Sequence, residues 1–174
     1  RKGIEVDETL RTNQKDVWAI GDATGKSILA HVGIQQGIIC GENIMANNAM
    51  LRKMDYGVIP AVIYSIPEVA TVGIIPEDLS QVRVEKIPFS VNLRANIEDY
   101  PDGFIKLWMR DGKLLAVQAI GHNVSEIIQE FANMIALETP VEKVAEIIHA
   151  HPSYAEMARS AFAYTLGKAV DFYL

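Results

Sequence analysis

Residues 103–121 read GFIKLWMRDGKLLAVQAIG and contain the clearest signal for the fold of this chain. Residues 104–109 alternate only in part, since Lys106 interrupts an otherwise apolar run, and we interpret them as a strand with one buried face. Asp111-Gly112 separates this run from the apolar residues 114–121. An Asp-Gly pair between two strands favours a tight hairpin turn, because both central residues of that turn need a positive φ. The sequence therefore predicts an antiparallel β-hairpin.

Three shorter runs before this hairpin have the composition of β-strands, at residues 61–64, 69–73 and 82–89. A turn signal that contains Pro67 separates the first two runs. The segments after the hairpin have helical periodicity instead. Strands in antiparallel succession followed by helices predict an α+β domain over residues 56–174, in which an antiparallel sheet has helices packed on it.

Three helices are expected in the last part of the chain, over residues 125–137, 139–148 and 153–166. The first carries a broad apolar stripe. Thr139 and Pro140 are expected to be the N-cap and the first residue of the second helix. Pro152 is expected to begin the third helix, and Gly167 to close it.

Residues 1–55 have a different organisation. An apolar run at residues 17–20 predicts a short strand, and residues 27–48 predict a helix after a loop. One strand and one helix do not make a domain. This part is therefore interpreted as an incomplete edge piece of an α/β domain, joined by a linker to residues 56–174.

Composition limits the class of protein. The 174 residues carry 16 Lys and Arg against 22 Asp and Glu, and the resulting net charge of −6 argues against a nucleic-acid partner. No stretch is long and apolar enough to span a membrane, and the first residues lack a signal-peptide core. Cys40 is the only cysteine, so no disulfide can form within the chain and a reducing compartment is expected. Its apolar neighbours predict a buried thiol.

Residues 149–156 read HAHPSYAE and carry the strongest chemical signal. We expect His151 to lie just outside the helix that begins at Pro152, with Glu156 folding back towards it. A carboxylate beside an imidazole fixes its tautomer and prepares it for general acid/base catalysis. Two other interpretations are open. One is a helix cap in which Glu156 only suits the helix dipole. The other is a metal site that includes His149, although the sequence offers no further ligand cluster and we predict no metal.

Three segments together resemble the carboxy-terminal part of the flavin-dependent pyridine nucleotide-disulfide oxidoreductases, and within them the dihydrolipoamide dehydrogenase branch. They are TNQKDVWAIGD at residues 12–22, IPAVIYSIPEVATVG at residues 59–73 and HAHPSYAE at residues 149–156. They follow the order and spacing of the family and cover nearly the whole chain. The resemblance implies that residues 56–174 form the dimerisation (interface) domain of the family and that residues 1–55 end its FAD-binding domain.

The resemblance also implies a partial FAD site. Asp22 would accept hydrogen bonds from the ribityl hydroxyls of FAD. The backbone of Leu29 and Ala30 would touch the flavin ring at a helix start, where free N–H groups and positive potential are available. His122, in the turn after the hairpin, is expected to lie on the surface.

By the same resemblance, His151 would take a proton from a dihydrolipoamide thiol, and Glu156 would hold and polarise His151. The pair would act on the flavin and disulfide of the other subunit in a homodimer formed through residues 56–174. The apolar stripe of residues 125–137 would serve that interface, and His149 would be a structural neighbour. The implied partner is the lipoamide-bearing acyltransferase of a 2-oxo-acid dehydrogenase complex, in the cytoplasm or an organelle matrix.

Part of the machinery of the family is absent from this sequence. It has no Gly-x-Gly-x-x-Gly motif for FAD or NAD and, with Cys40 alone, no Cys-x4-Cys redox pair. We therefore expect the NAD site to lie elsewhere in the parent enzyme and this chain alone to be inactive. Two alternatives are open: a non-catalytic dimerisation module, and part of another disulfide reductase of the family, such as a glutathione-type enzyme.

Overall fold

The computed structural model describes residues 3–46 and 51–170. The chain divides into two compact units, Arg1–Tyr56 and Gly57–Leu174, one residue beyond the expected boundary. The second unit contains the β-sheet, and the first contains the longest helix. No helix within the described ranges is long and apolar enough to cross a membrane.

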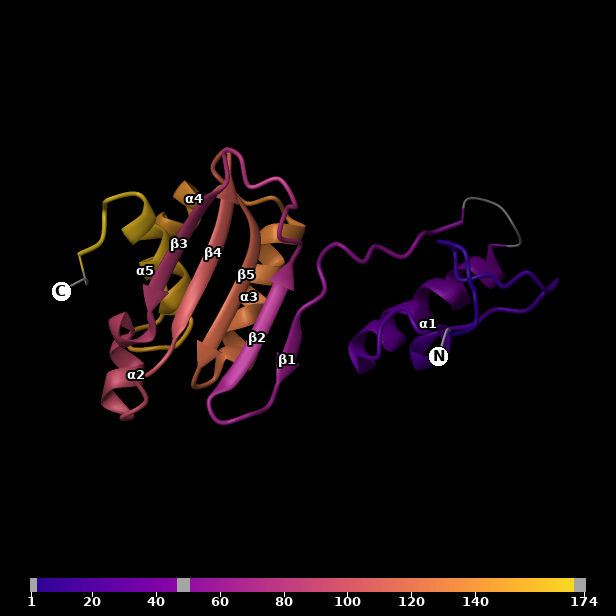
Figure 1. Ribbon diagram of the computed structural model, residues 1–174, viewed down its shortest axis with the longest axis horizontal. Coiled ribbons are helices and arrows are strands. Elements are labelled where there is room, and N and C mark those ends of the chain that lie inside the picture. The colour runs from indigo at the N-terminus through magenta and orange to yellow at the C-terminus, as the bar shows by residue number, and fades with distance from the viewer. Residues whose placement is uncertain (1–2, 47–50, 171–174) are drawn as a thin grey trace. The chain divides into compact units, whose positions relative to one another are not determined.

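A five-stranded antiparallel sheet forms the centre of the second unit (Figure 1). Its strands, in the spatial order β1-β2-β5-β4-β3, are β1 (Ala61–Ile63), β2 (Glu68–Gly73), β3 (Arg83–Pro88), β4 (Phe104–Arg110) and β5 (Lys113–Gly121). The predicted hairpin is confirmed as β4 and β5. Asp111 and Gly112 turn the chain between them with φ angles of 51° and 71°, as a tight hairpin turn requires.

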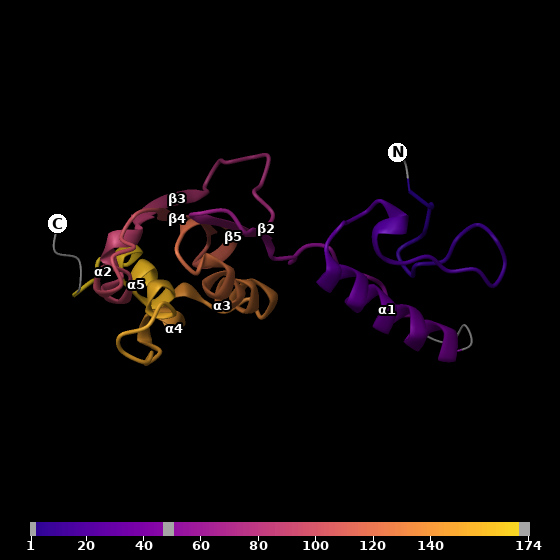
Figure 2. The same ribbon diagram turned by 90° about the horizontal axis from the view of Figure 1, so that it is seen from below.

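Among the described residues of the second unit, the helices cover one face of this sheet and none covers the opposite face (Figure 2). The elements besides the strands are η2 (Phe89–Val91), α2 (Leu93–Ile97), α3 (Val124–Ala136), α4 (Val141–Glu146) and α5 (Glu156–Thr165). Alternate strand residues such as Val72, Leu107 and Val117 join Phe131 and Phe162 in one buried core. The predicted α+β class is thereby confirmed, since burial of this apolar surface between sheet and helices is what stabilises such a layer pair.

The apolar stripe of α3 belongs to this core. Val124, Ile127, Ile128 and Phe131 are each at most 3% exposed, and α3 packs against β2 and β5. The expectation that this stripe serves a two-fold interface is therefore wrong. The apolar face of the sheet needs a cover of its own, and α3 provides it.

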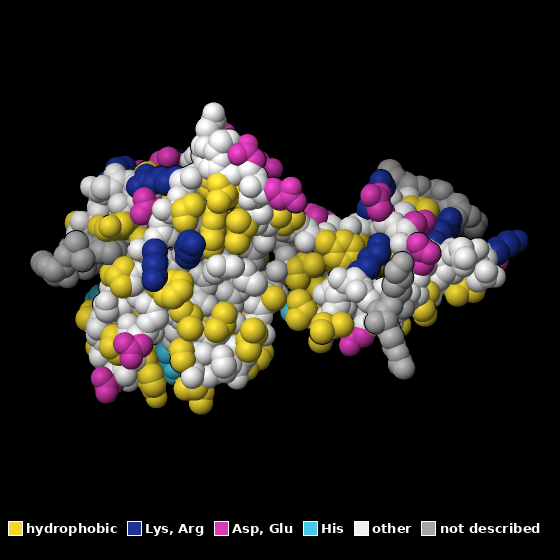
Figure 3. All heavy atoms as spheres, in the orientation of Figure 1, with side chains coloured by type: hydrophobic (Ala, Val, Ile, Leu, Met, Phe, Trp, Pro, Cys, Tyr) yellow, Lys and Arg dark blue, Asp and Glu magenta, His cyan; other side chains and the backbone are white. Residues whose placement is uncertain are grey.

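The helix-free face of the sheet is mixed in character. Successive residues of a strand point to opposite faces, so Phe104, Lys106 and Trp108 of β4 share this side. The register places Lys86 directly opposite Lys106. The Lys86 ammonium lies 4.2 Å from the Phe104 ring centroid and that of Lys106 lies 4.8 Å from the Trp108 ring. Figure 3 views this face, where hydrophobic side chains surround a few cationic ones, and the aromatic rings stabilise the cations.

Helix α4 begins and ends differently from the prediction. Pro140, with an extended ψ of 137°, takes the cap position that was expected for Thr139, and no side chain caps the helix. The N–H of Val141 donates to the backbone oxygen of Gly112 at 3.0 Å. This bond to the β4–β5 turn holds the residues before α4 in an extended conformation. The helix ends at Glu146, two residues earlier than expected.

Helix α5 begins at Glu156, four residues after the proline that was expected to start it. The peptide bond between His151 and Pro152 is cis. The N–H of Ser153 donates to the side chain of Glu156 at 2.7 Å, so a side chain rather than a helical turn orders this segment. Gly167, with a φ of 69°, follows the helix end as predicted.

The first unit is built around α1 (Ala30–Met45) and the short η1 (Gly21–Thr24). The strand expected at residues 17–20 is not formed. Trp18 makes an isolated bridge with Arg11, and the described part of this unit contains no strand that could extend the pairing. A strand needs a neighbour to satisfy its backbone groups, so the apolar run stays irregular.

Helix α1 begins at Ala30, three residues later than expected, and its expected end at residue 48 lies outside the described residues. Gln36, which is fully buried, ties the helix to the rest of the unit. Its side-chain oxygen accepts the N–H of Gly21 at 2.6 Å, and its amide donates to the hydroxyl of Tyr56 at 2.9 Å. Satisfying both ends of a buried amide fixes η1 against α1.

Candidate active site

His151 and Glu156 meet at the loop between α4 and α5. Nδ1 of His151 lies 2.8 Å from Oε1 of Glu156, so the predicted contact is present. The other carboxylate oxygen accepts the N–H of Ser153 at 2.7 Å. The side chain of Glu156 is 16% exposed, and that of His151 is 63% exposed. A sheltered carboxylate therefore holds an imidazole that is open to solvent.

This contact sets the chemistry of the imidazole. An ionised carboxylate only accepts hydrogen bonds, so Nδ1 of His151 carries the proton and donates to Glu156. In the neutral ring, Nε2 then keeps its lone pair. A nitrogen of this kind can take a proton from an acidic group that is brought to it and return the proton later, which is general acid/base catalysis.

Asn92, which is 2% exposed, connects the loop to α2. Its Nδ2 donates to the backbone oxygen of Ser153 at 3.0 Å, and its Oδ1 accepts the N–H of Ala95 at 3.1 Å. One buried amide thus caps a helix and fixes the loop that carries His151. Sequence reasoning missed Asn92. An asparagine before a short helix is a recognisable cap, but nothing local indicates its second bond.

Tyr154 provides another tie for this loop. Its hydroxyl donates to Oε2 of Glu98 at 2.8 Å, and its ring stacks on Phe89. Burial, followed by the neighbouring carboxylate, raises the pKa of Tyr154 to about 12. The hydrogen bond from Tyr154 is the main cause that holds the pKa of Glu98 below its usual value. Tyr154 therefore stays protonated at neutral pH and acts as a structural donor.

A second histidine–glutamate pair lies beside the first. Nε2 of His149 lies 2.7 Å from Oε1 of Glu130 in α3, and its Nδ1 lies 3.0 Å from the backbone oxygen of Ile147. The side chain of His149 is only 7% exposed. Sequence reasoning treated His149 as a structural neighbour but missed Glu130, since a polar residue on an amphipathic helix carries no signal of its own.

His122 is half-buried rather than a surface residue. Its ring stacks on that of Tyr100, with centroids 4.0 Å apart and planes at 7°, and lies 5.6 Å from the ring of Tyr154. With the turn between β1 and β2 it lines a pocket of about 400 Å³. The turn position suggested exposure, but the rings of Tyr100, after α2, and Tyr154, before α5, lie against His122.

The residues expected to touch a flavin lie in the first unit. Asp22 is exposed within η1, Leu29 precedes α1, and Ala30 is the first residue of α1. No side chain caps the start of α1, so the helix offers backbone N–H groups and positive potential there. A Cβ on Gly33 would lie 3.4 Å from the Cα of Gly21. This close approach brings η1 and the first turns of α1 together.

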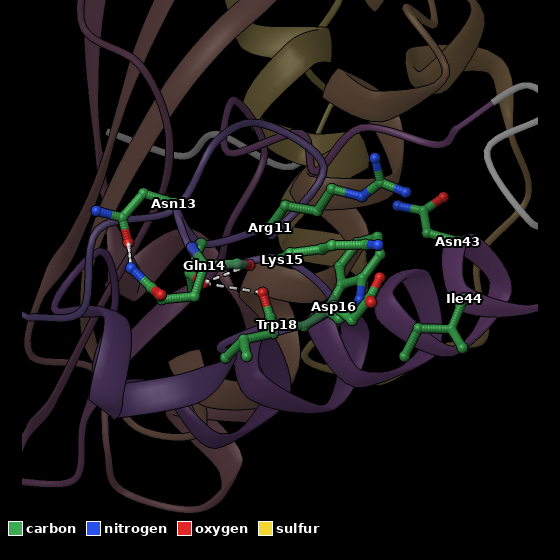
Figure 4. Close-up of a pocket in the computed structure, with 10 residues that line it drawn as sticks. Arg11, Asn13, Gln14, Lys15, Asp16, Trp18, Asn43 and Ile44 are labelled. Carbon is green, nitrogen blue, oxygen red and sulfur yellow. Dashed lines mark hydrogen bonds between the residues drawn. The ribbon is translucent and has the colours of Figure 1, made fainter.

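A pocket of about 540 Å³ lies in the same unit, at the carboxy-terminal end of α1 (Figure 4). Residues 11–18 line it together with Asn43 and Ile44 of α1. The guanidinium of Arg11 lies 4.8 Å from the centroid of the Trp18 ring. The lining includes neither a histidine nor any of the three residues expected at the flavin, so this pocket adds no group to the candidate acid/base site.

Cys40 and the histidines bear on thiol and metal chemistry. Cys40 is buried in α1, as predicted, and burial raises the pKa of its thiol. Since the thiolate is the reactive form, this favours a structural role.

Across residues 3–46 and 51–170, no group of three or more His, Cys, Asp or Glu residues is arranged to hold a metal ion. His149, considered above as a ligand, is bonded to Glu130 instead.

Comparison with known protein families identifies the family of this chain. The model of the pyridine nucleotide-disulphide oxidoreductase dimerisation domain matches residues 59–162, and that of the pyridine nucleotide-disulphide oxidoreductase domain matches residues 1–37. The chain belongs to the pyridine nucleotide-disulphide oxidoreductase family. The resemblance inferred from the sequence motifs is thereby confirmed.

Curated relatives in this family carry the name dihydrolipoyl dehydrogenase. The protein of Chlamydia muridarum is 38% identical over 160 residues, which are 88% of this chain and 34% of the relative. That of Geobacillus stearothermophilus is 36% identical, over 96% of this chain and 36% of the relative. The mitochondrial protein of Sus scrofa is 36% identical, over 99% of this chain and 35% of the relative. The chain thus spans about a third of the length of these relatives.

Solved structures of other proteins share the fold of this chain. LpdA from Mycobacterium tuberculosis matches with a TM-score of 0.82 at 24% identity, over 94% of this chain and 36% of that one. The HOCl-induced flavoprotein disulfide reductase RclA from Escherichia coli, as a Cu(II) complex, matches with a TM-score of 0.84 at 20% identity. That match covers 93% of this chain and 38% of RclA. At this identity the likeness establishes the fold alone.

Proposed function

We propose that this chain is the carboxy-terminal part of a flavin-dependent dihydrolipoyl dehydrogenase, which oxidises dihydrolipoamide with NAD. The observation that carries the proposal is the 2.8 Å contact between His151 and Glu156 at an exposed loop of the dimerisation domain. The names of the relatives support the same branch of the family. Because the chain spans only about a third of those relatives, the activity belongs to a longer protein.

In this proposal His151 is the acid/base for the substrate thiols. Its Nε2 takes the proton of one dihydrolipoamide thiol and leaves a thiolate, which attacks a disulfide far faster than the thiol does. Glu156 keeps Nδ1 protonated and holds the ring in one orientation. The imidazolium that forms lies beside a carboxylate, which stabilises its charge. The disulfide under attack lies outside this chain, whose only cysteine is Cys40.

The first unit would supply part of an FAD site. Asp22 would accept hydrogen bonds from ribityl hydroxyls, and the uncapped start of α1 at Leu29 and Ala30 would face the flavin ring. When bound, FAD supplies the two-electron acceptor. The sequence has no glycine-rich motif for the FAD pyrophosphate or for NAD. We therefore propose that other segments of the parent provide those contacts and that this chain alone is inactive.

The second unit would supply the subunit interface. Its family is a dimerisation domain, and we propose a homodimer in which His151 of one subunit serves the flavin and disulfide of the other. A lipoamide-bearing acyltransferase of a 2-oxo-acid dehydrogenase complex would present the substrate. Since the sheet already covers the stripe of α3, the interface uses other surfaces of residues 57–174.

Light scattering tests the homodimer. At tens of micromolar, the purified chain is expected to have twice its monomer mass of 19.2 kDa. A mass that stays at the monomer value over this concentration range would contradict the proposed interface.

A chimera tests the catalytic proposal. This chain replaces the matching part of the Geobacillus stearothermophilus relative, which supplies the remaining two thirds of the enzyme. The chimera is expected to oxidise dihydrolipoamide with NAD, and His151→Gln is expected to slow it by about 10²–10⁴-fold, the usual contribution of a general acid/base. The visible absorption of bound flavin should stay the same. A flavin-loaded chimera with equal rates for His and Gln would refute the proposed role.

A second candidate function is a dimerisation module without catalysis. The single cysteine favours it, because no dithiol redox couple can form within the chain. The visible absorption spectrum of the purified chain helps to separate the two candidates. A flavin band supports a usable FAD site in the first unit. A dimer without flavin, together with an inactive chimera, would favour the module.

A further inference from the structure

We propose that Glu130 and His149 are positioning residues that anchor the loop carrying His151. For its catalytic meaning this rests on the proposed function, in which His151 is the acid/base. The anchor itself stands on geometry, since a buried imidazole joins α3 to the loop that follows α4. It gives a task to the second histidine–glutamate pair, which the acid/base chemistry does not use.

Both ring nitrogens of His149 have an acceptor within hydrogen-bond distance. Nε2 lies 2.7 Å from Oε1 of Glu130, and Nδ1 lies 3.0 Å from the backbone oxygen of Ile147. An ionised carboxylate and a backbone carbonyl both only accept. The two contacts are therefore complete when the ring carries both protons, or when Glu130 keeps one. In either form two atoms on different sides of the ring are held, so its orientation is fixed.

Burial gives this contact its strength. The side chain of His149 is 7% exposed and that of Glu130 is 29% exposed, whereas ion pairs that lie open to water contribute little. A buried polar group that loses its partner also pays a full desolvation penalty. Because both of its ring nitrogens are bonded, His149 has none left to receive a substrate proton.

The anchor lies on one side of His151, and a second tie lies on the other. Two residues before it, His149 is bound to α3. Two residues after it, Ser153 is bound by Asn92 through its backbone oxygen and by Glu156 through its N–H. The ring of His151 is 63% exposed, so packing around it does not hold it. Its place is set by Glu156 and by these two ties.

Such positioning matters for an acid/base on a loop. Catalytic groups work only within a narrow range of geometry, and a displacement of about 1 Å can cost about 10²-fold in rate. Loops hold side chains less firmly than helices do, unless supporting contacts lock them. The bond from His149 to Glu130 transfers the rigidity of α3, which packs against β2 and β5, to the loop.

Ring-nitrogen NMR of the full chain tests the anchor. Histidine labelled with ¹⁵N reports which nitrogen of His151 carries the proton, and the measurement needs no activity. Glu130→Ala removes the carboxylate, whereas Glu130→Gln keeps an amide that can bond to His149 in either protonation form. Glu126→Ala is the matched control, because Glu126 is an exposed glutamate one turn earlier on α3.

The wild-type chain is expected to show His151 mainly in the Nδ1-protonated form, as its bond to Glu156 requires. Glu130→Ala is expected to lose this preference, so that both tautomers give comparable signals. Glu130→Gln restores the preference, and Glu126→Ala leaves it unchanged. A merely structural role would lower the melting temperature in Glu130→Ala and leave the tautomer of His151 as it was, which would overturn the proposal.

Glu130→Asp gives a milder form of the same test. This variant keeps the charge but moves the carboxylate back by one methylene. It replaces Glu130→Ala in the test if the alanine variant does not fold, as judged by far-ultraviolet circular dichroism. A shift of the His151 tautomer towards Nε2–H supports the anchor. An unchanged tautomer, in a variant whose His149 signals have moved, rejects it.

The chimera keeps this inference separate from the proposed function. A lower kcat in Glu130→Ala with little change in KM, together with the tautomer shift, supports a positioning role in catalysis. If the tautomer shifts but His151→Gln leaves the rate unchanged, the anchor stands and the proposed acid/base role fails. If the His151→Gln chimera is slow but Glu130→Ala changes neither the tautomer nor the rate, the proposed anchor is wrong and the proposed acid/base role stands.

Discussion

Two histidines on one loop each pair with a glutamate, but they differ in their exposure to solvent. The imidazole of His151 is 63% exposed, whereas that of His149 is 7% exposed. Their distances to a carboxylate, 2.8 and 2.7 Å, hardly differ. The two histidines differ at the ring nitrogen that does not contact the carboxylate. Nδ1 of His149 is bonded to a backbone oxygen, while Nε2 of His151 has no hydrogen-bond partner among residues 3–46 and 51–170.

The comparison shows that a pairing does not define a role by itself. In our proposals the same two residue types form an acid/base when one ring nitrogen is left open to solvent, and a structural tie when both ring nitrogens are bonded. Exposure decides the direction in which each variant should act. Substitution of the exposed histidine should change the rate strongly with little change in stability, whereas substitution of the buried histidine should lower stability more and the rate less.

The largest difference is expected in catalysis. In the chimera, His151→Gln removes the proton acceptor and should slow dihydrolipoamide oxidation by about 10²–10⁴-fold. His149→Gln leaves that acceptor in place and keeps an amide near Glu130, so its loss should stay near or below about tenfold, since only positioning is affected. Steady-state rates at saturating substrate measure both. Equal losses of rate in the two variants would contradict the different roles proposed for His151 and His149.

Stability should rank the two histidines in the opposite order. His149→Ala leaves Glu130 and a backbone oxygen without their partner and should lower the free energy of unfolding by about 1–3 kcal/mol. His151→Ala, at an exposed site, should change it by about 0.5 kcal/mol or less. Urea unfolding followed by Trp108 fluorescence in a Trp18→Phe background reports on the second unit alone. A larger loss from His151→Ala would contradict the assignment of the anchor.

The smallest expected effect concerns Tyr154 and depends on pH. Tyr154→Phe removes the donor to Glu98. The contribution of Glu98, whose pKa is lowered, is present above its usual value of 4.5 and is lost as the pH falls through the lowered pKa. That of Tyr154, whose pKa is raised to about 12, is present below its usual value of 10.0 and is lost as the pH rises through about 12.

The difference in stability between the wild-type chain and Tyr154→Phe should therefore be largest between pH 4.5 and 10.0. Urea unfolding across this range and on its acid side measures the difference. Arg94→Gln is a useful companion, because it removes the other partner of Glu98 and keeps the phenol. A difference that grows on acidification would show that this hydrogen bond is not its source.

Local chemistry made much of the fold predictable. The Asp111-Gly112 turn and its flanking apolar runs predicted β4 and β5, because turn type and strand pattern depend on neighbouring residues. The contact between His151 and Glu156 was predictable for the same reason, since five residues separate the two. The prediction that a helix begins at Pro152 was wrong. The local preference of proline for a helix start does not include the bonds that Ser153 makes to Glu156 and Asn92.

What could not be predicted depends on residues far apart in the chain. The stripe on α3 indicated that something apolar covers the helix, and only the fold shows that the sheet does so rather than a second subunit. The run at residues 17–20 had strand composition but no partner strand within the described part of its unit. Asn92 lies 61 residues before its partner Ser153, and Glu130 lies 19 residues before its partner His149. No sequence pattern encodes such pairs.

The hydrogen bond from Asn92 to Ser153 closes a segment of 61 residues. The entropy lost on closing a segment grows with its length, and contacts between distant residues form late during folding. The β4–β5 hairpin closes over a two-residue turn and has no such delay. We therefore expect the loop of His151 to acquire its geometry after the β4–β5 hairpin has formed, so that a partly folded chain contains this hairpin before it contains the candidate acid/base site.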